Sequence, residues 1–172
     1  MKLNAKQLRV TKPGRENWSQ IKRQPIYIVL DSVMDTYNIG SIFRLADAVA
    51  AQELILCGKT ETPPSSRIHK AAVGTEEWVK WRYFPNVNAA ITSLKAEVPG
   101  LKVLIVEQNA QAVGLDKLQT QLPVALIVGH ETEGVSPEAL QVADEIVEIP
   151  MYGVNKSLNV VVSTGIVLYR LV

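Results

Sequence analysis

Residues 149–160 read IPMYGVNKSLNV and join two apolar segments. The first segment, EIVEIP, ends at Pro150, and the second, VVVSTGIVLYRLV, continues to residue 172. Glycine, asparagine and serine between them are typical of a loop. The β-branched residues of the last segment favour a strand, but a helical stripe also fits, formed by Leu158, Val161, Val162, Gly165, Leu168 and Tyr169. We predict a C-terminal helix, because this segment follows a strand in an alternating pattern.

The rest of the chain shows the same alternation. We predict strands at 26–31, 53–58, 78–84, 102–108, 124–129 and 145–150. We predict helices at 38–50, 86–98 and 136–143, and a long loop at 59–77 that contains Pro63-Pro64 and Gly74. The pattern indicates an α/β fold, with a mainly parallel sheet flanked by helices. Ligands of such sheets bind beyond the carboxyl ends of the strands.

Composition is that of a soluble protein, since 47% of the 172 residues are hydrophobic and 20% are charged. The N-terminal MKLNAKQLRV has no apolar signal core, and no segment reaches the roughly 18 apolar residues of a membrane span. We therefore expect a cytoplasmic protein. The one cysteine, Cys57, excludes an internal disulfide, and we interpret it as a buried strand thiol.

Charge is unevenly distributed along the chain. Residues 1–23 hold seven basic residues against Glu16 alone, a net charge of +6, and the remainder carries −5. A basic arm before an acidic body suggests an anionic partner, of which nucleic acid is the first candidate. A solvated, partly disordered terminus fits the charge pattern equally well.

Three predicted loops at strand ends carry unusual residues: DSVMDTYNIGSIFR (31–44), VGHETEGVSPE (128–138) and the opening stretch. The second loop has the spacing GxxxxG-x-S, but Val135 replaces the lysine of a phosphate-binding loop, and Glu131 and Glu133 would repel phosphate. No GxGxxG is present. This loop better suits a ligand that is neutral or cationic where it makes contact.

Two histidines are candidate functional groups. His130 follows a strand end, and because histidine is a common general base in proteins it is a candidate for that role. We favour the alternative, a loop histidine whose side chain points away while its backbone is used. His69 lies near Arg67 and Lys70 and fits a basic patch. No His/Cys cluster is visible, so we predict no metal site.

Taken together, the three loops resemble the three motifs of the SpoU/TrmH family of RNA ribose methyltransferases, in the SPOUT superfamily. Asn38-x-Gly40-x-x-x-Arg44-x-Ala46-x-Ala48 resembles motif 1. LIVGHETEGVS (126–136) resembles motif 2, and IPMYGVNKSLNVVVSTGIVLY (149–169) resembles motif 3. The resemblance runs from about residue 26 to the end.

The resemblance implies a fold, a cofactor and a substrate. Family members have an α/β sheet with a C-terminal deep trefoil knot, an exception to the near absence of knots in proteins. They bind S-adenosyl-L-methionine in the knot, largely through backbone groups, and they work as homodimers. The methyl group is transferred to a ribose 2′-hydroxyl of tRNA or rRNA. We therefore expect RNA as the partner of this chain.

Site residues follow from the motif positions. The resemblance assigns cofactor contacts to motifs 2 and 3, namely Gly129, Gly134, Ile149, Met151 and Leu158. It assigns the catalytic face to Asn38, Arg44, Glu131, Ser157 and Asn159, with Asn38 orienting Arg44 or the ribose and Glu131 holding that network. Ser157 is also expected to cap the helix that follows. Because a guanidinium hardly ever loses its proton, we expect Arg44 to grip the adjacent phosphate and stabilise charge on the 2′-oxygen.

Some features depart from the family pattern. Val49-Ala50-Ala51 replaces an aromatic residue and glycine, and NVVVSTGI replaces the more frequent NVSVA, so Val161 and Val162 are expected to alter packing in the knot. We divide the chain into a basic arm (1–24) and a SPOUT methyltransferase domain (25–172). The RNA-binding domain related to ribosomal protein L30, frequent in the family, has no counterpart before the first strand. Two alternatives stay open: a knotted RNA-binding protein without catalysis, and a small-molecule enzyme of similar fold.

Overall fold

The computed structural model describes residues 2–14, 18 and 20–172. The strands are β1 (Gln24–Asp31), β2 (Ala51–Cys57), β3 (Trp81–Phe84), β4 (Lys102–Val106), β5 (Val113–Gly114), β6 (Val124–Gly129) and β7 (Glu145–Glu148). The helices are α1 (Ala5–Val10), α3 (Thr36–Ala48), α4 (Ser66–Ala72), α5 (Val87–Glu97), α6 (Pro137–Val142) and α7 (Val160–Leu171). Two 3₁₀ turns, η1 (Thr75–Glu77) and η2 (Leu115–Lys117), complete the described elements.

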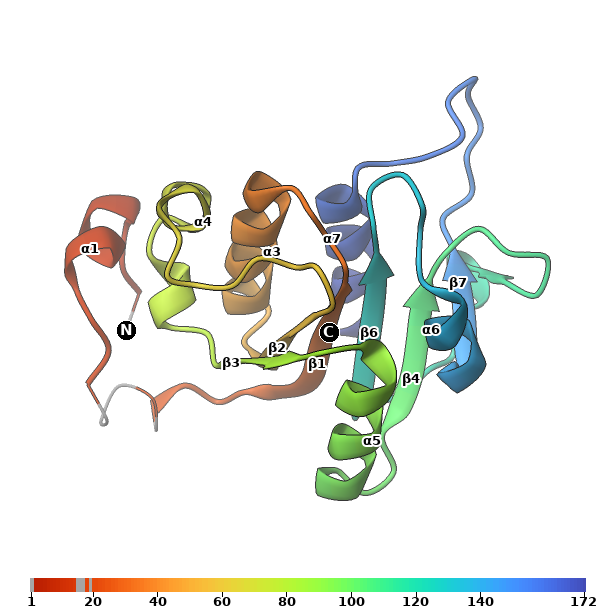
Figure 1. The fold of residues 1–172 in the computed structure, drawn as a ribbon, viewed down its shortest axis with the longest axis horizontal. Coiled ribbons are helices and arrows are strands. Elements are labelled where there is room, and N and C mark those ends of the chain that lie inside the picture. The colour runs from red at the N-terminus through yellow and green to blue at the C-terminus, as the bar shows by residue number, and fades with distance from the viewer. Residues whose placement is uncertain (1, 15–17, 19) are drawn as a thin grey trace.

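The strands form one sheet in the order β3-β2-β1-β6-β4-β7-β5, and every pairing is parallel. This confirms the predicted α/β class with a parallel sheet flanked by helices (Figure 1). β6 lies near the middle of the sheet and is buried along its whole length, which explains its continuous apolar sequence. Its neighbours β1 and β4 lead away toward opposite edges, so the carboxyl ends of β1 and β6 mark a topological switch point.

Two apolar layers cover the sheet. Helices α3, α4 and α7 pack on one face, where Leu126 and Val128 of β6 point. Helices α5 and α6 pack on the other, where Ala125 and Ile127 point. The predicted apolar face of α3 is buried, and it comprises Ile39, Ile42, Phe43, Ala46 and Val49.

A glycine sets the close approach of α3 and α4. A Cβ added at Gly40 would lie 2.6 Å from the Ala71 Cβ and 2.7 Å from the Ile68 carbonyl oxygen. Real Cβ atoms do not come so near, so any larger residue here would push the two helices apart. This packing fixes the helix that presents the first motif.

The segment 59–77 is not a plain loop as predicted. It contains α4, whose N-terminus is capped by the Ser65 hydroxyl, and then η1. The helix ends where Val73 and Gly74 adopt left-handed backbone conformations. The sequence does not reveal this helix because α4 is only seven residues long and follows a proline- and serine-rich stretch.

Other boundaries also differ. The strand predicted at 78–84 begins only at Trp81, because η1 and its cap occupy the preceding residues, and the two-residue strand β5 was not predicted. The strands predicted at 102–108 and 145–150 end at Val106 and Glu148. The chain therefore leaves the sheet earlier than expected, and residues 107–108 and 149–150 belong to the loops.

The C-terminal helix is confirmed, and its predicted stripe is correct only in part, since Leu168 is buried and Val161 packs against the core. Asn159, not Ser157, is the N-cap, and its side-chain oxygen accepts a hydrogen bond of 2.8 Å from the Val161 N–H. The helix therefore starts later, and the face it buries against α3 and the sheet is formed by Val160, Thr164, Val167 and Leu168. Val162 and Tyr169, predicted in the stripe, are exposed.

The N-terminal segment packs against the domain. Asn4 caps α1 with a reciprocal hydrogen bond to Gln7, and the Trp78 indole N–H donates to the Thr11 carbonyl at 3.3 Å. Arg23 donates to the Trp78 carbonyl at 2.6 Å. The lysines and Arg9 of this segment are exposed, whereas Arg15 and Glu16 lie outside the described residues.

Candidate functional site

Glu131 ties two of the three strand-end loops together. Its carboxylate accepts hydrogen bonds from the backbone N–H groups of Met34 (3.1 Å) and Asp35 (2.9 Å), and from the Asn38 amide (2.9 Å). Partial burial raises the pKa of Glu131, but these hydrogen bonds outweigh it, so the pKa is lowered from its ordinary value. The carboxylate is thus held ionised at the start of α3.

Asn38 extends this network to the third loop. Its side-chain oxygen accepts a hydrogen bond of 3.1 Å from the Asn159 amide, while Asn159 caps α7 with its own oxygen. Glu131, Asn38 and Asn159 therefore form one hydrogen-bonded chain across all three loops. The expected network of Asn38 and Glu131 is present, but Arg44 makes no recorded hydrogen bond or ion pair to any described residue.

Arg44 lies on the outer face of α3. Its side chain is exposed, on the same side as Ser41 and Ala48 and apart from the buried face of the helix. Asp35 is the N-cap of α3, and its carboxylate accepts a hydrogen bond of 2.7 Å from the Tyr37 N–H. This cap stabilises the end of the helix that carries the first motif. A guanidinium in this position is free to meet a ligand from solvent.

The loop after β6 is folded tightly on itself. His130 and Gly134 exchange two backbone hydrogen bonds of 2.9 and 3.0 Å, and the His130 ring Nδ1 accepts the N–H groups of Thr132 and Glu133. A Cβ at Gly129 would lie 2.3 Å from the Gly134 carbonyl carbon and oxygen, and Gly134 has a φ of +72°. Both glycines are therefore required by the loop geometry. The His130 backbone is hydrogen-bonded within the loop, but its ring does not point away as expected, because it accepts two hydrogen bonds that hold the loop.

Buried Asp31 supports the same loop from β1. Its carboxylate accepts the Ser136 N–H at 2.7 Å, and the Ser136 hydroxyl in turn caps α6 by accepting the Ala139 N–H. The predicted helix start, with Ser136 as N-cap and Pro137 in the first turn, is confirmed. Asp31 was not recognised in the sequence, although its place at the end of the first strand is a usable signal.

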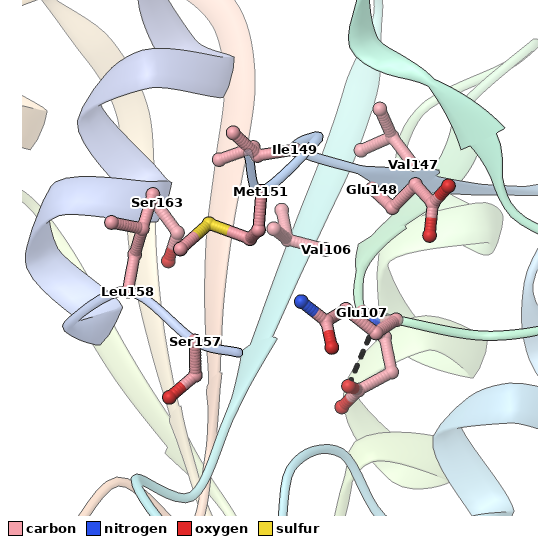
Figure 2. A pocket seen from close by; sticks show the side chains of 10 residues that line it. Val106, Glu107, Val147, Glu148, Ile149, Met151, Ser157, Leu158 and Ser163 are labelled. Atoms are coloured by element: carbon pink, nitrogen blue, oxygen red, sulfur yellow. Dashed lines mark hydrogen bonds between the residues drawn. The ribbon is translucent and has the colours of Figure 1, made fainter. Parts of the chain in front are cut away.

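Two cavities open where these loops meet. The first, of about 150 Å³, is lined by Val106, Glu107, Gln108, Val147, Glu148, Ile149, Met151, Ser157, Leu158 and Ser163 (Figure 2). The second, of about 200 Å³, is lined by Val106, Glu107, Val128, Gly129, His130, Glu131, Thr132, Gly134, Ser157, Leu158, Val160 and Ser163. Five residues line both cavities, so the two cavities form one continuous site.

Most predicted site residues line these cavities. The five candidates for cofactor contacts, and the catalytic candidates Glu131 and Ser157, are all among the lining residues. Asn38 and Asn159 lie next to them in the hydrogen-bonded chain. Arg44 does not line either cavity. Val106 and Glu107, at the end of β4, were missed, although the rule that ligands bind at carboxyl ends of strands also covers β4.

The lining is acidic. Glu107 and Glu148 line the first cavity, Glu107 and Glu131 the second, and no lysine or arginine is among the described residues that line either one. Such a site favours a ligand with positive charge and disfavours a nucleotide triphosphate. This agrees with the ligand type expected from the sequence of the loop after β6.

The remaining chemically active side chains lie elsewhere. The His69 ring pairs with the carboxylate of buried Glu76. Cys57 is buried in β2, and this burial, with a smaller contribution from Asp31, raises the pKa of its thiol to about 12. Within the described ranges, no group of three His, Cys, Asp or Glu residues could hold a metal ion, and no helix is long and apolar enough to cross a bilayer.

Fold and site together define an α/β protein with an acidic ligand site at the carboxyl ends of β4, β6 and β7 in a parallel sheet. The family model described as the SpoU rRNA Methylase family matches residues 25–169. The chain belongs to this family.

Individual relatives are similar over most of the chain. The tRNA (guanosine(18)-2′-O)-methyltransferase of Escherichia coli K12 is 31% identical over 153 residues, which cover 87% of this chain and 64% of that protein. The chain thus spans less than two thirds of this relative. The crystal structure of the Aquifex aeolicus TrmH/SpoU tRNA modifying enzyme has a TM-score of 0.78 and 28% identity, over 96% of this chain and 79% of that one. The AdoMet-bound rRNA methyltransferase of Sinorhizobium meliloti has a TM-score of 0.77 and 30% identity, over 95% and 58%.

Proposed function

We propose that this protein transfers a methyl group from S-adenosylmethionine to a ribose 2′-hydroxyl in tRNA or rRNA. The observation that carries the proposal is the meeting of all three motif loops around one acidic site, joined by the chain Glu131–Asn38–Asn159. The names of the relatives support both the reaction and the class of RNA.

The residues present fit this cofactor. Its sulfonium is cationic, and the described lining has carboxylates and no basic side chain. Gly129 and Gly134 both line the second cavity, and neither carries a side chain that would cover the backbone of this loop. Gly129, Gly134, Ile149 and Leu158 would hold the cofactor through backbone groups, and Met151 would form an apolar wall, which Figure 2 shows beside Ile149.

S-adenosylmethionine supplies a methyl group on a positively charged sulfur when it is bound. In the reaction, the ribose 2′-oxygen forms a bond to the methyl carbon while the carbon–sulfur bond breaks and its electron pair returns to sulfur. The hydroxyl proton leaves to solvent. The protein's task is therefore to place the hydroxyl and to stabilise the negative charge that develops on its oxygen.

Arg44 would supply that stabilisation. It is exposed, it has no recorded partner among the described residues, and a guanidinium binds phosphate and oxyanions without losing its proton. Asn38 and Asn159 would fix the edge of the site on which the ribose lies, and Ser157 would contact the ribose or the cofactor where the two cavities join.

Replacing Arg44 tests this assignment. Arg44→Ala should abolish methyl transfer and leave the affinity for S-adenosylhomocysteine, measured by calorimetry, nearly unchanged. Arg67→Ala, which removes an exposed cation from α4, is the matched control and should retain transfer. Loss of cofactor binding in Arg44→Ala would show that the role of Arg44 is structural. An inactive wild type that still binds RNA would instead support the non-catalytic alternative.

We infer that the chain forms a homodimer through α7. Val162, Ile166 and Tyr169 recur at helical spacing along α7 and are 48%, 38% and 60% exposed. A continuous apolar stripe of this kind is typical of an interface. Light scattering should give twice the chain mass of 18.9 kDa, and Val162→Glu should halve it. Val10→Glu, on the exposed surface of α1, is the control; a monomeric wild type would contradict the inference.

We also infer that residues 149–172 form the trefoil knot of the family. After β7 the chain makes the loop 149–159 and returns as α7, which packs beside α3 and against β4 and β6 (Figure 1). An experimental structure whose backbone straightens without a knot when both ends are pulled would contradict this inference.

The basic arm is proposed to meet RNA phosphates. Because this segment packs on Trp78, deleting it would expose the core, so glutamine at Lys2, Lys6, Arg9 and Lys12 is the cleaner change. Each lost phosphate contact should lower the slope of log affinity against log salt by about 0.7 to 0.9. An unchanged slope would exclude the arm from RNA binding.

A further inference from the structure

Glu107 lies where the two cavities join. The residues that line both are Val106, Glu107, Ser157, Leu158 and Ser163, and Glu107 is the only charged one among these described residues. A ligand that fills both cavities has its middle at this point. Figure 2 shows Glu107 across the first cavity from Ser157. The family motifs quoted above do not include this residue.

The carboxylate of Glu107 is held in place by the backbone on both sides. One oxygen, Oε1, accepts the Gln108 N–H at 2.9 Å, and the other, Oε2, accepts the Val135 N–H at 3.1 Å. The Glu107 N–H itself donates to the Val147 carbonyl of β7 at 3.1 Å. Because a carboxylate oxygen has about two acceptor sites, each oxygen can accept one more hydrogen bond.

The loop after β6 is shaped around this side chain. A Cβ at Gly134 would lie 2.2 Å from Glu107 Oε2, and the left-handed backbone of Gly134 also favours glycine. A residue with a side chain would displace the carboxylate from the junction of the cavities. Glu107 and Gly134 are therefore coupled parts of one binding surface.

We propose that Glu107 binds the two ribose hydroxyls of the methyl cofactor. This rests on the proposed function. In S-adenosylmethionine the ribose is the middle of the molecule, between the adenine and the amino-acid chain, and it presents two adjacent hydroxyl donors. A carboxylate with one acceptor site open on each oxygen matches such a pair, and hydrogen bonds to an ionised acceptor are stronger than neutral ones.

Calorimetry with three ligands tests the proposal. S-adenosylhomocysteine carries the same ribose without the sulfonium charge, and its 2′-deoxyribose counterpart lacks one hydroxyl. The wild type should bind the first about 10- to 100-fold more tightly than the second, the range of one charge-assisted hydrogen bond. Glu107→Gln should lose most of that preference and should weaken S-adenosylmethionine and S-adenosylhomocysteine by the same factor.

Glu133→Gln is the matched control, because it removes a negative charge from the loop that packs on Glu107, and Glu133 lines neither cavity. It should keep the wild-type preference. The proposal is overturned if Glu107→Gln retains the preference, or if it weakens only S-adenosylmethionine, since Glu107 would then face the sulfonium. The wild-type comparison stands even if the variant does not fold. If the wild type binds both ligands equally, only this inference fails, whereas no binding of any of the three ligands overturns the proposed function as well.

Discussion

Gly129 is the position at which adding a single methyl group should disrupt the loop after β6 while the rest of the protein stays folded. It ends β6, and the chain folds back so closely that a Cβ would lie 2.3 Å from the Gly134 carbonyl carbon and oxygen and 2.4 Å from the Val135 nitrogen. Carbon atoms in contact are normally about 3.5 to 4 Å apart. Gly129→Ala therefore requires the opposing backbone to move by more than about 1 Å.

The cost of that movement can be estimated. Overpacking a rigid site costs about 1 to 3 kcal/mol, and the two backbone hydrogen bonds between His130 and Gly134 contribute about 1 kcal/mol each if they are lost. We expect Gly129→Ala to lower the free energy of unfolding by about 3 kcal/mol, which corresponds to about 6 to 12 °C in Tm for a chain of this size. Cofactor affinity should fall at least about tenfold, because the displaced loop lines the second cavity.

Urea denaturation and calorimetry with S-adenosylhomocysteine measure the two effects. Gly153→Ala is the matched control in the loop that follows β7, since nothing lies within 4 Å of its added Cβ. It should change stability by less than about 0.5 kcal/mol. If Gly129→Ala matched Gly153→Ala in both assays, the close packing of this loop would not be a requirement of the site.

Three further predictions concern charge and burial. Arg82→Ala should cost about 3 kcal/mol in urea denaturation, because it removes the partner that donates two hydrogen bonds of 2.9 and 2.8 Å to the buried Glu53 carboxylate; no change in stability would show that water replaces Arg82. The lowered pKa of Glu131 means that its ionised form stabilises the fold, so this contribution is complete above its ordinary pKa of 4.5 and is lost as pH falls through the lowered value. The stability difference between wild type and Glu131→Gln should therefore shrink on acidification, and a constant difference from pH 7 to 3 would contradict it. Cys57, with its pKa raised to about 12, should react with an aromatic disulfide reagent only after unfolding, and rapid reaction of the native protein would refute its burial.

The sheet and the loops were predictable because their signals are local. The continuous apolar runs of β1 and β6 have no other simple interpretation in an alternating chain, and Ser136-Pro137 marks the start of α6 by its own chemistry. The meeting of the three loops followed from one geometric rule, that parallel strands end at the same edge.

The missed features depend on contacts between distant residues. Strand β5 has only two residues and exists because it pairs with β7, and α4 is placed by its packing against Gly40. The stripe of α7 was misplaced because Asn159, rather than Ser157, caps the helix, and Asn159 is also held by Asn38. Glu107 falls inside the strand predicted at 102–108, and only the packing of the loop after β6 against its carboxylate distinguishes it.

The central claim is tested most directly by methyl transfer to RNA that carries no modifications. The protein would be incubated with methyl-labelled S-adenosylmethionine and, separately, bulk tRNA and rRNA, and the digested RNA examined for 2′-O-methyl nucleosides, with Arg44→Ala in parallel. We predict label in 2′-O-methyl nucleosides of one RNA pool, and none with Arg44→Ala. Label on a base rather than on ribose, or no label in either pool although the protein binds both cofactor and RNA, would contradict the account.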